Sequence, residues 1–171
     1  DRWELDAGVH VAVPDVQVGA ADSRVGDRDL HLARPRRLGL DRRHLDSPIA
    51  DVTGGQQAVE YLISLGHRRI GYISDPLDTS FNFTSSRDRY QGYRQALQAA
   101  GIPLRPDYHA QGEHGRAVAR RLATAMLALP ERPTAIAAAS DTQALGVLEA
   151  ARLAGCRVPD DLAVIGYDDI E

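Results

Sequence analysis

Apolar positions after residue 50 follow two different spacings, and each spacing predicts a different element. Stretches with apolar residues three or four positions apart are typical of amphipathic helices, and short runs of consecutive apolar residues are typical of buried strands. The expected helices are 56–65, 85–100, 118–129 and 140–154. The expected strands are 70–73, 108–111, 135–139 and 162–165. Strand and helix therefore alternate along the chain.

Cap residues mark where these helices begin and end. A glycine follows three of them, as expected for a left-handed C-terminal cap: Gly66, Gly101 and Gly155. Ser85 and Ser86 are expected to cap the second helix. Ser140 and Gln143 have the spacing of a capping box at the start of the fourth helix. We interpret Gly54 and Gly55 as a flexible entry to the first helix.

The apolar stripes predict which side chains face the core. The inward-facing residues expected on the first, second, third and fourth helices are, in order, Ala58, Tyr61, Leu62 and Leu65; Tyr90, Tyr93, Ala96, Leu97 and Ala100; Val118, Leu122, Ala125, Met126 and Leu129; Leu145, Leu148 and Ala151.

Alternating strands and helices predict an α/β fold, a doubly wound parallel sheet of the Rossmann-like type with helices on both faces. In such sheets ligands bind outside the carboxyl ends of the strands. The segments expected at that edge are 74–78, 112–114, 140–141 and 167–169.

The first 50 residues have a different character. They are rich in Arg and Asp and show little helical periodicity. Val9, Val11 and Val13 alternate like a short strand, which residues 16–18 extend beyond Pro14. We therefore divide the chain into 1–50, either an atypical remnant of an N-terminal subdomain or an unstructured, aberrant segment, and 51–171, a ligand-binding subdomain.

The composition argues against several classes of protein. The chain has 171 residues, of which 43% are hydrophobic, so one domain can bury a sizeable core. No apolar run reaches the roughly 20 residues of a membrane span. A net charge of −4 argues against a protein that coats nucleic acid, because such proteins carry a basic excess.

Nothing in the sequence predicts an enzyme or a metalloprotein. It has no nucleophile elbow and no phosphate-binding P-loop. The six histidines lack metal-ligand spacing and Cys156 is the single cysteine, which we interpret as a small loop residue. We expect no catalytic residue, no metal and no cofactor.

Two arginines stand in the first turn of the second expected helix, where a cation opposes the helix dipole. Arg87 and Arg89 are therefore either solvated surface residues or part of a ligand clamp. A guanidinium offers a planar fork of donors suited to hydroxyls or carboxylates. Asp168 would be the opposing acceptor, unless Asp168 and Asp169 form a solvated turn.

Several stretches resemble the LacI/GalR family of bacterial transcriptional regulators. They are YLISLGHRRIGYIS (61–74), SSRDRYQGYRQALQAAGI (85–102) and LALPERPTAIAAASDTQALGVLEAARLAGCRVPDDLAVIGYDDIE (127–171). The resemblance implies a periplasmic-binding-protein-like core made of two Rossmann-like subdomains, with an effector in the cleft between them. This chain resembles the C-terminal subdomain.

The same resemblance assigns effector-binding residues by position. Arg89 stands three residues before Gly92 in the R-x-x-G motif, and Asp168 is the first Asp of the G-Y-D-D motif. Ser140 stands where Asn is common in the family, which changes the hydrogen bonding offered to the ligand. His114 corresponds to a pocket residue that is often aromatic. We expect Arg89 to face the ligand rather than the core.

The resemblance also implies partners. We expect a small-molecule effector, a sugar or another small polar ligand, whose binding in the cleft controls operator affinity. Operator DNA would be contacted only through a helix-turn-helix that this chain does not contain. A cytoplasmic homodimer without membrane contact is expected. The alternative is a periplasmic solute-binding protein that feeds a transporter.

Overall fold

A computed structural model describes residues 3–5, 9–11, 48–77 and 84–167 of the chain. The main unit is a parallel sheet with strand order β4-β3-β5-β6. Its elements are, in chain order, α1 (Pro48–Ser64), β3 (Ile70–Ser74), α2 (Ser85–Ala99), a 3₁₀ turn (Pro106–Tyr108), β4 (His109–Gln111), α3 (Arg116–Leu127), β5 (Ala135–Ala138), α4 (Asp141–Leu153) and β6 (Ala163–Ile165).

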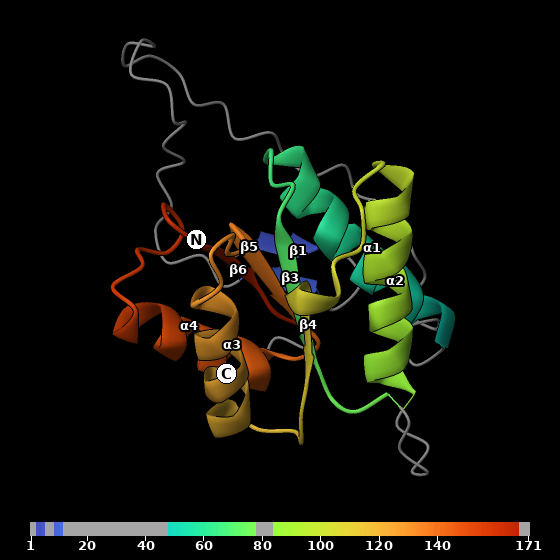
Figure 1. Cartoon of the computed structure of the whole chain (residues 1–171). Coiled ribbons are helices and arrows are strands. Elements are labelled where there is room, and N and C mark those ends of the chain that lie inside the picture. The colour runs from blue at the N-terminus through green and yellow to red at the C-terminus, as the bar shows by residue number, and fades with distance from the viewer. Residues whose placement is uncertain (1–2, 6–8, 12–47, 78–83, 168–171) are drawn as a thin grey trace, which may run out of the picture.

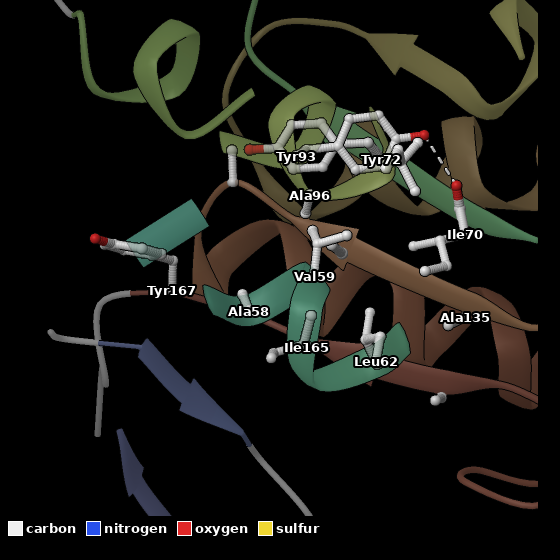
Figure 2. Packing of buried hydrophobic residues seen from close by; sticks show 14 residues of the cluster. Ala58, Val59, Leu62, Ile70, Tyr72, Tyr93, Ala96, Ala135, Ile165 and Tyr167 are labelled. Atoms are coloured by element: carbon white, nitrogen blue, oxygen red, sulfur yellow. Dashed lines mark hydrogen bonds between the residues drawn. The ribbon is translucent and has the colours of Figure 1, made fainter. Parts of the chain in front are cut away.

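Helices cover both faces of this sheet (Figure 1). α1 and α2 pack on one face, in a cluster of buried residues that includes Val59, Tyr93, Ile70 and Ile165 (Figure 2). α3 and α4 pack on the other face in a second cluster of buried apolar residues. β3, β5 and β6 are buried at every position, as expected when a parallel sheet is covered on both sides, whereas the edge strand β4 is only partly buried. The predicted doubly wound α/β architecture is confirmed.

Three helices end just before the glycines that were predicted to terminate them. Gly66, Gly101 and Gly155 have φ values of 94°, 66° and 69°. In each case the next residue donates its N–H to a carbonyl in the last helical turn, for example Ile102 to Leu97 at 2.9 Å. This bond satisfies carbonyls that the helix leaves open, and glycine takes the left-handed conformation without a Cβ penalty.

The second helix begins at Ser85 as expected, but the prediction that Ser85 and Ser86 cap it is wrong. Thr84 occupies the N-cap position of α2 and its side chain makes no capping hydrogen bond. Ser86 lies inside the first turn, and its Oγ instead accepts a hydrogen bond from the backbone N–H of Asp75 at 3.1 Å. The helix start is thus tied to the segment that follows β3.

Several predicted inward-facing residues are also wrong. Tyr61 on α1, Leu65 directly after it, Ala100 after α2, Ala125 on α3 and Leu145 on α4 are exposed. The faces that pack are instead lined by smaller neighbours, such as Ala119 and Ala123 on α3 and Gly146 on α4. On α4 the prediction relied on the large residue Leu145, whereas the close contact with α3 is made by Gly146.

Gly54 and Gly55 lie in the second turn of α1 and are buried, so their interpretation as a flexible entry is wrong. A Cβ on Gly55 would press on the backbone of Arg89, and a Cβ on Gly92 would press on the backbone of α1 at Val52 and Gln56. These two glycines allow the backbones of α1 and α2 to approach closely. α1 also begins at Pro48, before the expected start of the helix at residue 56.

The N-terminal part contributes a two-stranded antiparallel sheet, β1 (Trp3–Leu5) and β2 (Val9–Val11). β2 matches the first part of the predicted valine strand, and β1 was not predicted. The expected continuation over residues 13 and 16–18 lies outside the described residues.

Candidate functional site

The carboxyl ends of the strands bring segments from distant parts of the sequence to one edge. Ile73 is aligned with Ala138 in β5 and with Ala110 in β4, and Ala137 is aligned with Ile165 in β6. The residues just beyond these positions therefore meet at the same edge, as predicted for 74–77, 112–114, 140–141 and Tyr167, whereas residues 78, 168 and 169 of the predicted segments lie outside the described residues.

Arg89 is held at this edge by three protein groups. Its Nε donates to Oδ1 of Asp51 in α1 at 2.7 Å, and its Nη1 donates to the carbonyl oxygen of Ala139 at 2.6 Å. Its guanidinium lies 3.5 Å from the ring centre of Tyr167, beyond β6. Only 13% of the side chain is exposed. The side chain thus joins α1 and α2 to the ends of β5 and β6, and its expected role in binding a ligand stays a prediction.

A second set of hydrogen bonds is centred on Asp75, directly after β3. Its Oδ1 accepts from Gln143 Nε2 at 2.9 Å and lies 3.2 Å from His114 Nδ1. Ser140 is the N-cap of α4, and its Oγ accepts from the backbone N–H of Gln143 at 3.3 Å. The predicted capping box is thus half formed, because the Gln143 side chain turns to Asp75. These bonds connect the ends of β3 and β5 with the loop after β4.

An aromatic group lies in the core behind this edge. The rings of Tyr90 and His109 stack with their centres 3.9 Å apart, and the Tyr72 ring lies 4.9 Å from that of Tyr93. The Tyr93 hydroxyl donates to the Ile70 carbonyl at 3.0 Å (Figure 2). The Tyr72 hydroxyl is buried and has no hydrogen-bond partner among the described residues.

Burial controls the ionisation of this group. It raises the pKa of the Tyr72 hydroxyl far above its usual range, although the charge of Arg89 opposes the shift. Burial also lowers the pKa of His109 to about 4, so the ring is neutral at pH 7. The neutral ring is hydrogen-bonded to Ser74 Oγ through Nε2 at 2.9 Å. Tyr72 and His109 are therefore both uncharged at pH 7.

The structure brings together three of the four predicted site residues. Arg89 donates to the carbonyl of Ala139, the residue directly before Ser140. His114 lies beside Asp75, which accepts from the Gln143 side chain, and the Gln143 backbone N–H donates to Ser140. Asp168 lies outside the described residues. Arg87, the other candidate clamp residue, has a side chain that is 59% exposed.

Sequence analysis did not single out four of the residues that organise this edge: Asp51, Asp75, Gln143 as a side-chain donor, and Tyr167. Asp75 and Tyr167 lie in segments predicted to reach the edge, so the rule for parallel sheets was a usable signal for them. Asp51 gave no such signal, because it lies on a helix and not after a strand.

This edge offers donors and acceptors in alternation. Guanidinium, imidazole, amide and hydroxyl groups lie beside carboxylates and a backbone carbonyl. Such a mixture suits a small polar ligand with several hydroxyl groups. Among the described residues no group of histidine, cysteine or carboxylate side chains is arranged to hold a metal ion. None of the described helices combines the length and the apolar character needed to cross a membrane.

Fold and edge together define a Rossmann-like ligand-binding domain. In a comparison with known families, a family model described as a periplasmic binding protein-like domain matches residues 59–171. The HTH-type transcriptional repressor CytR of Escherichia coli K12 is 38% identical over 134 residues, which is 78% of this chain and 37% of the repressor.

Solved structures agree with this match. A regulatory protein of the LacI family from Chloroflexus aggregans is 42% identical, with a TM-score of 0.65 over 70% of this chain and 42% of that one. A sugar-binding transcriptional regulator of the LacI family from Escherichia coli, complexed with phosphate, is 30% identical, with a TM-score of 0.64 and the same coverage.

The chain belongs to the periplasmic binding protein-like domain family and corresponds to part of the effector-binding core of LacI/GalR regulators. The family resemblance drawn from the sequence motifs is confirmed. The chain spans a little over a third of the length of the curated repressor described above.

Proposed function

We propose that this chain is the C-terminal effector-sensing subdomain of a LacI-type transcriptional regulator, and that its effector is a sugar or a similar small polar ligand. The observation that carries the proposal is the polar edge formed by Arg89, Ser140 and His114 at the carboxyl ends of the parallel strands. We add Asp168 to this site on the strength of its position in the family motif. The similarity to a sugar-binding regulator of the LacI family from Escherichia coli supports this ligand class.

The contacts of Arg89 suggest how a ligand acts on the fold. Arg89 connects α1 with the ends of β5 and β6, so a ligand that takes one of its donors changes the connection between these elements. In the longer protein, closure of the cleft around the ligand would shift an attached helix-turn-helix head and change its affinity for operator DNA. A cytoplasmic homodimer suits a palindromic operator. The relatives described above are regulators, which supports this function over solute transport.

The test is a binding measurement on the whole 171-residue chain. Pentoses, hexoses, disaccharides and nucleosides are first screened by thermal shift, and the Kd of the best ligand is then measured by calorimetry. Arg89→Lys keeps the charge beside Asp51 but loses the planar fork, so we expect the affinity to fall at least about tenfold.

Arg87→Ala is the matched control, because it removes an exposed arginine from the same helical turn. We expect its Kd to equal that of the unmodified chain. The proposal is wrong if no polar ligand of the panel binds, or if the Arg87 and Arg89 variants weaken binding equally.

A further inference from the structure

A cavity lies at the opposite edge of the sheet, at the amino end of β3. Its volume is about 170 Å³. The floor is apolar and is formed by Tyr93 and Leu97 of α2 and by Ile102, which follows that helix. The one polar atom of this floor, the Tyr93 hydroxyl, is already bonded to the Ile70 carbonyl. An engineered cavity of about 150 Å³ with apolar walls holds benzene, so this space accepts a body of that size.

Three arginines surround the cavity, and they are not equivalent. Arg105 lies over the Tyr108 ring and is neutralised by Asp107 at 2.8 Å and Glu131 at 2.6 Å. Arg105 therefore contributes to the wall of the cavity, and its charge is already paired with carboxylates.

Arg68 and Arg69 have no carboxylate partner in the part of the chain that the structure describes. Arg68 Nη1 donates to the carbonyls of Ile63 and His67 at 3.1 and 3.2 Å. Arg69 Nε donates to the carbonyl of Arg132 at 3.1 Å. Backbone carbonyls thus hold both guanidinium groups in place and leave their positive charges uncompensated, with further N–H donors available.

We propose that this cavity binds a small organic acid, whose carboxylate pairs with Arg68 and Arg69 and whose apolar body enters the space over Tyr93, Leu97 and Ile102. A neutral ligand would leave the two charges unpaired, and an inorganic anion would leave the apolar space unfilled. Guanidinium groups pair with carboxylates through parallel hydrogen bonds, which gives the rim its selectivity. Asp107 and Glu131 lie on the Arg105 side, so the carboxylate of the ligand is directed toward Arg68 and Arg69.

This site is separate from the proposed effector site, because it lies at the amino ends of the strands and uses none of the same residues. A regulator with both sites would respond to two chemically different ligands. Either site can fail its test without affecting the other.

The probe is benzoate, titrated into the isotopically labelled full chain and followed by two-dimensional NMR of the backbone amides. We expect the shift changes to concentrate at residues 68–70, 97 and 102–108. Benzamide, which lacks the charge, and acetate, which lacks the apolar body, should each bind at least about tenfold more weakly. The proposal fails if acetate or phosphate produces the same shifts at the same concentration as benzoate, because simple attraction of anions would then explain the result.

Two variants and one control complete the test. Arg69→Ala should weaken benzoate binding at least about tenfold, and Arg68→Ala should act in the same direction. Arg121→Ala removes an exposed arginine from α3 on the other face of the sheet and should leave the affinity unchanged. Unchanged binding in both pocket variants, or no shift with benzoate in the unmodified chain, would overturn the proposal.

Discussion

Tyr72 and Tyr93 form a matched pair that tests the core directly. Both phenols are buried, with 2% and 0% of the residue exposed, and their ring centres lie 4.9 Å apart. They differ in one respect: the Tyr93 hydroxyl donates to the Ile70 carbonyl at 3.0 Å, whereas the Tyr72 hydroxyl has no partner among the described residues. Removing each hydroxyl by substitution with Phe therefore separates the effect of a made bond from that of a missing one.

The two variants should move the free energy of unfolding in opposite directions. Tyr93→Phe removes a buried hydrogen bond and should lower it by about 1 kcal/mol. Tyr72→Phe removes a hydroxyl whose burial costs about 1–3 kcal/mol when it is unpaired, so the free energy of unfolding should stay level or rise by up to about 1 kcal/mol. We expect the variants to differ by about 1–2 kcal/mol.

The assay is urea unfolding of the full chain followed by far-ultraviolet circular dichroism. Equal denaturant slopes for the two variants and the unmodified chain would show that only stability has changed. Equal losses of stability in both variants would refute the reasoning, because the Tyr72 hydroxyl would then have a partner of its own.

Three further predictions concern the packing and the edge. Burial lowers the pKa of His109 to about 4, below the 6.5 of an unperturbed histidine, so the unfolded chain binds the proton first as the pH falls. The contribution of the neutral ring to the free energy of unfolding is therefore complete above pH 6.5 and decreases as the pH drops toward 4. His109→Gln should flatten this dependence in unfolding curves at pH 7, 6 and 5. Gly92→Ala places a methyl group against the backbone of α1 and should lower the free energy of unfolding by about 1–3 kcal/mol, whereas Gln95→Ala, on the exposed side of α2, should leave the urea midpoint nearly unchanged. Ser140→Ala removes the cap of α4 and should cost about 1 kcal/mol in the same assay, and an unchanged midpoint would show that the cap is not needed.

Much of the fold follows from local sequence patterns. The helices and strands after residue 50 were predicted because apolar spacing and terminal glycines act within one or two turns of chain. The faces that pack were predicted less well, because they depend on contact with another element. Ala119 and Gly146 meet across α3 and α4 only after both helices are in place, and neither residue carries an apolar signal as strong as that of Leu145.

The sequence predicted that the candidate residues lie at the ends of the strands, but it did not predict which residues they contact. The rule for parallel sheets directed attention to segments after the strands, and the family motifs selected Arg89, Ser140 and His114. The pairs that hold these residues join Arg89 to Asp51 and Gln143 to Asp75, 38 and 68 positions apart. A spacing pattern gives no information about such pairs, because they exist only after α1, α2 and α4 have packed on the sheet.

The central claim is that a small polar ligand binds at the carboxyl edge of the sheet. The most direct measurement is a map of backbone amide shifts in the labelled full chain during titration with the best sugar from the binding panel. We predict that the perturbed amides gather at residues 74–77, 111–115 and 139–143, together with Arg89 and Tyr167. Shifts confined to the amino ends of the strands, or to the exposed sides of the helices, would contradict it.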